Sequence, residues 1–182
     1  MIQEVILVNE QDDAIGTMEK LAVHQHPKLH RAFSVFIFNS NGEMLLQQRA
    51  FHKYHSGGLW TNACCGHPSP DMSNTAAAAL KRLGEEMGMD CALNYGFHFI
   101  YKAEVGNGLI EHELDHVFFA MSDQIPQSNE DEVAAYQYIN IDKLKKDVAE
   151  NSAQYTEWFK IILDKVLNFF ENNQTQFATI SS

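Results

Sequence analysis

The stretch NTAAAALKRLGEEMG, residues 74–88, contains a clear helix signal. Its alanine and leucine residues predict a helix over residues 74–87, and Gly88 is the glycine expected just after a helix C-terminus. Glu85 and Glu86 fall in the last turn, where a negative charge opposes the helix dipole. We therefore expect these acids to serve binding or catalysis rather than helix stability.

Predicted strands lie on both sides of this helix. The strand segments are residues 4–8, 31–38, 43–48, 96–105, 109–120 and 133–139. The second and third predict a hairpin, because a glycine-containing turn joins them. Residues 142–150 and 154–172 predict two more helices. Strands interspersed with helices, but with few strand–helix–strand repeats, indicate an α/β fold of the α+β type, with a mixed β-sheet flanked by helices.

The sequence contains no repeat, no low-complexity stretch and no linker long enough to separate domains. We expect an N-terminal segment, residues 1–30, to pack with a main domain over residues 31–173 as one compact unit. Residues 174–182 are polar and are expected to form a frayed tail. Residues 51–70 break the strand pattern, and such a long irregular stretch is usually functional or disordered.

The charge balance limits the classes of partner. The 182-residue chain has 13 Lys and Arg against 24 Asp and Glu, a net charge of −11, which argues against a nucleic-acid or anionic-membrane surface. A small anionic ligand stays compatible, because a pocket needs only a few local cations. No apolar run approaches the roughly 20 residues of a membrane span, and the N-terminus lacks the basic region of a signal peptide, so we expect a cytoplasmic protein.

Three separate segments hold residues typical of metal ligands, namely His24 with His30, then His67, then Glu111 with Glu113. On a strand, residues i and i+2 project from the same face, so the two glutamates would stand side by side and repel unless a cation lies between them. The mixed nitrogen and oxygen set suits Zn²⁺, Mn²⁺ or Mg²⁺. The alternative is a pair of solvent-facing acids on an edge strand.

The segment HELDH, residues 112–116, matches the zinc-protease pattern H-E-x-x-H. That motif requires a helix, in which both histidines bind the metal. Glycines precede this segment and Val117 with two phenylalanines follows it, a context that favours a strand. In a strand His112 and His116 would face away from Glu111 and Glu113, so the context argues against a protease.

The cysteines are expected to be reduced thiols, since Cys64 and Cys65 are adjacent and Cys91 would be left over. Cys65 lies in the turn-forming stretch TNACCGHP, residues 61–68, which favours a functional thiol over an inert buried one. Tyr101 and Trp158 are most simply core aromatics. Four cations from separate segments are candidates for phosphate binding, although each alone is more often a surface residue: Lys20, Arg49, Lys53 and Arg82.

These residues occur together in motifs that resemble, in the same order, those of type 1 isopentenyl diphosphate isomerases. The resemblance extends over roughly residues 5–158. The matching pieces are GTMEK (16–20) leading to His24, LHRAFS (29–34), WTN (60–62), CGHP (65–68), Tyr101, EHE (111–113) and DEV (131–133). Several separated motifs in order are far harder to obtain by chance than one.

The resemblance implies a Nudix-like fold and an enzyme that interconverts isopentenyl diphosphate and dimethylallyl diphosphate in isoprenoid biosynthesis. It implies two metals, a Mg²⁺ that helps bind the diphosphate near Glu86, and one Mn²⁺, Zn²⁺ or Mg²⁺ held by His24, His30, His67, Glu111 and Glu113. The implied acid/base groups are Cys65 and Glu113, assisted by Tyr101. The implied substrate-binding residues are Lys20, Arg49, Lys53 and Arg82 for the diphosphate and Trp158 for the hydrocarbon.

The sequence departs from the superfamily pattern in two places. Residues 81–89, KRLGEEMGM, contain most of a Nudix box, but Ser73 stands where an upstream acid is expected. Residues 54–58, YHSGG, replace the Pro-Gly form that we associate with the isomerases. A Nudix-type pyrophosphohydrolase of a small diphosphate is therefore the alternative function, and a non-catalytic metal-binding or prenyl-diphosphate-sensing module is a third. We expect a small-molecule partner and a monomer or small homo-oligomer.

Overall fold

A computed structural model describes residues 3–177 of the chain, which form one nine-stranded sheet with helices on both faces. The strands are β1 (Glu4–Val8), β2 (Ala14–Glu19), β3 (His30–Phe38), β4 (Glu43–Arg49), β5 (Trp60–Asn62), β6 (Cys64–Gly66), β7 (Asn94–Glu104), β8 (Ile110–Met121) and β9 (Val133–Asn140). The helices are α1 (Lys20–Gln25), α2 (Thr75–Met87), α3 (Ile141–Glu150), the 3₁₀ helix η1 (Ser152–Gln154) and α4 (Glu157–Phe177).

Strand β3 organises the sheet. It pairs in parallel with β8 from His30↔Glu113 to Phe38↔Met121, and antiparallel with β6 at Ser34↔Cys65. Strands β7 and β8 form a long antiparallel hairpin, while β4 lies between β5 and β9. The predicted mixed sheet flanked by helices is confirmed.

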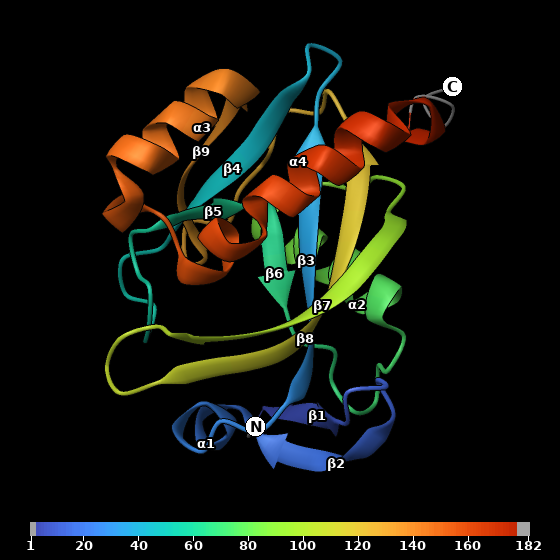
Figure 1. Cartoon of the computed structure of the whole chain (residues 1–182), viewed down its shortest axis with the longest axis vertical. Helices are drawn as coiled ribbons and strands as arrows, with labels where there is room; N and C mark the ends of the chain where they lie inside the picture. The colour runs from blue at the N-terminus through green and yellow to red at the C-terminus, as the bar shows by residue number, and fades with distance from the viewer. Residues whose placement is uncertain (1–2, 178–182) are drawn as a thin grey trace.

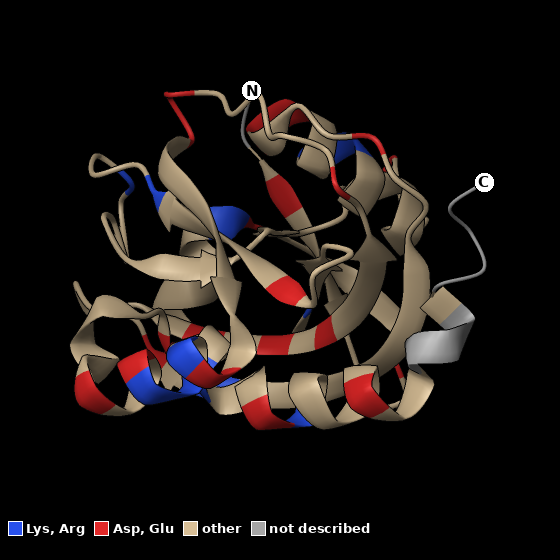
Figure 2. Ribbon diagram, turned by 90° about the horizontal axis from the view of Figure 1, so that it is seen from above, with Lys and Arg blue, Asp and Glu red and all other residues tan. Residues whose placement is uncertain are grey.

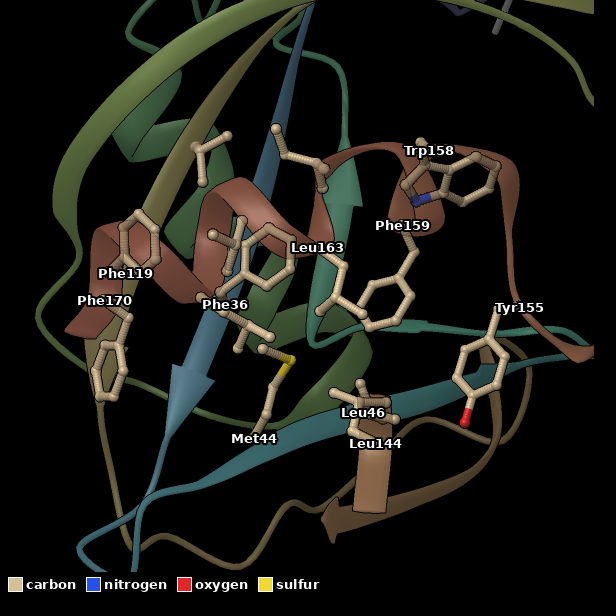
Figure 3. Packing of buried hydrophobic residues seen from close by; sticks show 14 of the residues in the cluster. Phe36, Met44, Leu46, Phe119, Leu144, Tyr155, Trp158, Phe159, Leu163 and Phe170 are labelled. Atoms are coloured by element: carbon tan, nitrogen blue, oxygen red, sulfur yellow. The ribbon is translucent and has the colours of Figure 1, made fainter. Parts of the chain in front are cut away.

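The two faces of the sheet are covered by different helices. In Figure 1, α4 crosses the front of β3 and β8, and α2 lies behind them. Side chains of β3 alternate between the two cores, with Phe36 and Phe38 on the α4 side and Val35 and Ile37 on the α2 side. Figure 3 shows the α4-side packing, in which aromatic and aliphatic residues of α4 meet Phe36 and the end of β8.

Two predicted features of the sheet differ from the structure. The expected hairpin of residues 31–38 and 43–48 pairs only near its tip, at Phe38↔Met44, because β3 and β4 then diverge to pair with other strands. The stretch 51–70, predicted to be irregular, contains β5 and β6. These strands are only three residues long and lie in a polar, glycine-rich stretch. So short a strand shows no alternation of polar and apolar residues by which it could be predicted.

The last helix begins and ends later than predicted. Gln154, the predicted first residue, is the last residue of η1, so α4 begins at Glu157, and it continues to Phe177 rather than ending at residue 172. Phe177 is seven residues after Phe170, so it falls on the same helix face and is buried against it. The expected tail therefore does not begin at residue 174, and its residues 178–182 lie outside the described residues.

The N-terminal segment is more structured than the single strand that the sequence predicted. Strand β2 and helix α1 follow β1, and the Glu19 carboxylate accepts hydrogen bonds from the first backbone N–H groups of α1. Asp12 joins this segment to the sheet through an ion pair to Arg31 at 2.7 Å and a hydrogen bond with His116 at 2.9 Å. None of the helices in the described part of the chain is long and apolar enough to cross a membrane.

Two glycines give a test of the packing. Gly96 lies at the bulge of β7, where an added Cβ would meet the Phe119 ring at 2.4 Å and the Phe169 ring at 3.2 Å. Gly96→Ala should lower the free energy of unfolding by about 1–3 kcal/mol through overpacking. Gly84→Ala is the control, because Gly84 is exposed within α2 and an added Cβ would make only an ordinary van der Waals contact, with the Met89 carbonyl oxygen at 3.8 Å. This substitution should raise stability by about 0.5–1 kcal/mol. Urea unfolding measures both changes, and equal stability of the two variants would contradict this description of the core.

Candidate metal centre and acid/base pocket

Five predicted metal ligands meet at one buried point. Ligand atoms of His24, His30, His67, Glu111 and Glu113 all lie within 4.8 Å of one another. They come from α1, the start of β3, the residue after β6, and β8. The register explains the meeting, because His30 is the parallel partner of Glu113, and the two glutamates share one face of β8.

Backbone carbonyls orient two of the histidines. Nδ1 of His24 donates to the carbonyl of Lys20 at 2.5 Å, and Nδ1 of His30 donates to the carbonyl of Lys28 at 2.9 Å. Each bond places the ring proton on Nδ1 and leaves Nε2 with a lone pair directed into the cluster. This arrangement is common for metal-binding histidines, whose second nitrogen is held by an outer partner.

The donor set fits a divalent cation. His24 Nε2 and Glu111 Oε2 lie 2.9 Å apart, yet both are buried atoms without a hydrogen-bond partner in the described part of the chain. His30 Nε2 and His67 Nε2 are 3.2 Å apart. Buried polar atoms that converge without satisfying one another suggest a missing common partner, and imidazole with carboxylate suits Zn²⁺, Mn²⁺ or Mg²⁺.

The two carboxylates have opposite pKa shifts. Burial and the charge of Glu113 raise the pKa of Glu111 to about 7. For Glu113, burial acts against ionisation, but the neighbouring His30 and His67 outweigh it and lower the pKa well below the usual range. Like charges buried side by side favour only one ionised group. A bound cation would let both ionise.

A cavity of about 480 Å³ adjoins this cluster. All the residues predicted for catalysis and substrate binding line it, namely Lys20, Arg49, Lys53, Cys65, Arg82, Tyr101, Glu113 and Trp158. The predicted metal ligands His67, Glu86 and Glu111 line it too, whereas His24 and His30 are buried behind the wall. The structure thus brings together residues that are up to 138 positions apart in sequence, Lys20 and Trp158.

The acid/base candidates approach the cavity from both sides of β3. Cys65 is on β6, which pairs with one edge of β3, and Glu113 is on β8, which pairs with the other edge. Tyr101 on β7 donates a hydrogen bond of 2.5 Å to Glu113 Oε2. Burial raises the pKa of Cys65 to about 12, so the group is a thiol at neutral pH. Cys64 belongs instead to the core on the α2 side.

Two of the four predicted phosphate-binding cations, Lys53 and Arg82, are held by acids. Glu132 Oε2 accepts from Arg82 Nη2 at 2.6 Å and also pairs with Lys53, and Arg82 Nε contacts Glu86 Oε1 at 2.7 Å. Burial and the nearby charge of Arg82 lower the pKa of Lys20. Figure 2 shows that acidic residues are distributed over strands, helices and loops of this chain, whose net charge is −11.

Sequence reasoning missed several residues of the pocket. Glu132 was noted only as part of a family motif, and His55 was noted only as part of a divergent loop. Ser34 Oγ donates to the buried Asp115 at 2.7 Å beside the acid/base groups, and Gln47 Nε2 holds Glu86 Oε2 at 2.8 Å. Asp115 had a signal independent of the family motifs, because it continues the i, i+2 series of Glu111 and Glu113 on β8.

The H-E-x-x-H match has no helical context. Residues 112–116 lie within β8, and His112 and His116 are on the face away from the metal cluster. His112 Nδ1 contacts the carbonyl of Pro27, and His116 pairs with Asp12. Both histidines therefore attach the N-terminal segment to the sheet, and the strand prediction is confirmed.

The chain is similar to proteins of one family. The family model described as NUDIX domain matches residues 28–159. Isopentenyl-diphosphate Delta-isomerase of Pectobacterium atrosepticum is 47% identical over 170 residues, covering 93% of this chain and 94% of that protein. Isopentenyl-diphosphate Delta-isomerase 2 of Aromatoleum aromaticum is 46% identical, covering 92% of this chain and 88% of that protein.

Solved structures show the same fold. A crystal structure of a Deinococcus radiodurans protein has a TM-score of 0.66 at 17% identity, covering 82% of this chain and 90% of the other. The MutT protein of Methanosarcina mazei has a TM-score of 0.59 at 17% identity, covering 81% and 94%. At such identities the likeness concerns the fold alone.

The metal centre can be tested by substitution. Glu111→Gln removes an anionic ligand without changing the size of the side chain, so it should weaken Zn²⁺ or Mn²⁺ binding by more than ~10-fold. His112→Ala and His116→Ala are the controls on the opposite face of β8 and should keep one metal per chain. Metal titration of the metal-free proteins measures this. Retention of metal in Glu111→Gln, with loss in both histidine variants, would restore the protease-type site.

Proposed function

The chain belongs to the NUDIX-domain proteins and, among them, to the isopentenyl-diphosphate Delta-isomerases, and we propose that it interconverts isopentenyl diphosphate and dimethylallyl diphosphate. One observation of the structure carries this assignment beyond family membership. The thiol of Cys65 and the hydrogen-bonded pair of Tyr101 and Glu113 reach one cavity from opposite edges of β3. An isomerase that moves a double bond needs two such proton-transfer groups.

The reaction requires one proton to be added and another to be removed. A proton joins the terminal alkene carbon of isopentenyl diphosphate, a tertiary cation forms, and loss of a proton from the carbon nearer the diphosphate gives the allylic product. The interconversion is reversible, so a group that donates in one direction accepts in the other. We assign these transfers to Sγ of Cys65 and to the carboxyl of Glu113, with the Tyr101 hydroxyl positioned to hold a proton between steps.

The hydrocarbon end of the cavity must exclude water, because water would trap the cation. Trp158 and Tyr101 are almost fully buried there, at 4% and 6% exposed. The Arg49 guanidinium lies over the Trp158 ring at 5.3 Å, which shows that this ring takes a cation against it. Aromatic faces attract positive charge, so we assign Trp158 to stabilise the developing cation.

The diphosphate would bind at the cationic side of the cavity. Arg82 and Lys53 pair there with Glu132, and Lys20 stands on the same cavity wall. Both Glu86 oxygens are engaged by Arg82 and Gln47, so a Mg²⁺ beside Glu86 would take its remaining ligands mainly from the substrate. The histidine-held cation, when bound, would stabilise the anionic form of Glu113.

The alternative, a pyrophosphohydrolase, needs box carboxylates that aim a metal-activated water at phosphorus. Glu86 and Glu85 are present, but the upstream acid is replaced by Ser73. Among the described residues, only the histidine cluster gathers three or more possible metal ligands. Hydrolysis at phosphorus also does not require a buried thiol opposite a tyrosine–glutamate pair, so the isomerase is the better assignment.

Isotope labelling distinguishes these two functions. With Mg²⁺ and isopentenyl diphosphate in D₂O, the protein should form dimethylallyl diphosphate that carries solvent deuterium in a methyl group, because the added proton comes from exchangeable groups. NMR reports the double-bond position and the label together. Release of phosphate or pyrophosphate at the rate of substrate loss, without deuterated allylic product, would support the hydrolase.

Adjacent cysteines provide a matched pair for the acid/base assignment. Cys65→Ala should lower isomerisation by about 10²-fold or more, the range of acid–base catalysis, with little effect on folding. Cys64→Ala should keep most of the activity, since Cys64 packs in the core on the α2 side. Turnover and thermal unfolding of both variants measure this. Equal losses of activity, or unfolding of Cys65→Ala alone, would remove the catalytic role.

A further inference from the structure

His55 is a buried histidine that the mechanism above does not use. It lies on the loop between β4 and β5, only 6% exposed, and its Nε2 is 3.5 Å from Glu111 Oε1. The imidazole is not one of the five clustered ligands. In the described part of the chain, His55 Nε2 makes no hydrogen bond to another group, so Glu111 is the acceptor that it faces.

The two carboxylates of the cluster are held in the same way. Glu113 turns Oε1 to His67 at 2.7 Å, while its Oε2 accepts from the Tyr101 hydroxyl. Glu111 turns Oε2 to His24 at 2.9 Å, while its Oε1 faces His55. Each glutamate thus has one oxygen toward the ligand histidines and the other toward an outer donor, and His55 has the place beside Glu111 that Tyr101 has beside Glu113.

The surroundings of His55 fix its ring. It packs edge-on against Tyr54, with ring centroids 4.4 Å apart, and against Trp158 at 6.0 Å. Its Nδ1 faces Ser56 Oγ at 3.3 Å. The backbone of the loop is held from two sides, by Arg49 Nη2 at the His55 carbonyl and by Asn107 Nδ2 at the Tyr54 carbonyl. The ring is therefore held with Nε2 toward the carboxylate.

We propose that His55 is a positioning residue of the metal centre, which donates a hydrogen bond from Nε2 to Glu111 Oε1 and so directs Oε2 to the metal. The proposal rests on the proposed metal centre. Outer partners of this kind fix the orientation of ligating carboxylates, and their loss typically weakens metal binding by about 10–100-fold. The contact at 3.5 Å is slightly longer than a typical N–H···O bond and needs only a few tenths of an ångström to form one.

Substitutions can separate the hydrogen bond from the packing. His55→Phe keeps a ring against Tyr54 and Trp158 but removes the hydrogen-bond donor. His55→Met also removes the donor, and its flexible side chain makes it the alternative if the phenylalanine variant fails to fold. His55→Gln keeps an N–H donor of similar reach. His52→Ala is the control, because His52 is an exposed histidine on the same loop.

The experiment titrates each metal-free protein with Co²⁺ and follows binding by competition with a chromophoric chelator. His55→Phe and His55→Met should bind Co²⁺ about 10–100-fold more weakly than the wild type. His55→Gln should stay within about threefold of it, and His52→Ala should be unchanged. Excess metal should restore isomerisation in His55→Phe, which a defect of the cavity wall would not allow.

Wild-type affinity in both donor-free variants would overturn the proposal. Equal weakening in His55→Gln and His55→Phe would also overturn it, since His55 would then act as a direct ligand. A wild-type protein that binds no Co²⁺ would instead remove the metal centre itself. A wild type that binds Co²⁺ but does not isomerise the substrate would leave the role of His55 intact and contradict only the proposed function.

Discussion

The carboxylates of Glu111 and Glu113 are buried two residues apart on one face of β8, where their negative charges repel each other. The rest of the site is arranged around this repulsion. Burying two like charges costs far more free energy than burying one, unless cations or hydrogen-bond donors balance them. Histidines from α1, β3 and the end of β6 surround the pair, and Tyr101 and His55 face its outer oxygens. The free-energy cost of burying this pair explains why side chains from five other segments, namely α1, β3, the end of β6, β7 and the β4–β5 loop, meet at β8.

The convergence depends on how the N-terminal segment attaches to the sheet. Helix α1 carries Lys20 and His24, and it is placed by β1 pairing with the first residue of β3. Asp12, in the turn between β1 and β2, adds an ion pair to Arg31 on β3 and a hydrogen bond with His116 on β8. The face of β8 that points away from the metal cluster therefore contacts the N-terminal segment. That segment supplies His24 to the cluster on the other face of β8. Alternation along one strand separates these two tasks.

Residue spacing and flanking residues predicted the longer strands well, whereas very short strands and loop contacts could not be predicted. The i, i+2 spacing of Glu111 and Glu113 needs only a strand, so their shared face was predictable, and a context of glycines and aromatics was enough to reject a helical zinc motif. The two short strands β5 and β6 have too few residues for periodicity to show. His55 could not be found either, because its role comes from a loop that folds back onto Glu111, 56 positions away.

The lining of the cavity combines charged and aromatic side chains. Two of its cations are already paired, Arg82 with Glu86 and Glu132, and Lys53 with Glu132. Under the proposed function, a diphosphate would exchange these ion pairs for contacts with its own oxygens, while the acids limit the desolvation cost of holding the two cations in the cavity before it binds. Trp158 and Tyr101 line the same cavity and are buried. Under the proposed function, a substrate with one charged end and one apolar end would have one favourable orientation, with its alkene beside Cys65 and Glu113.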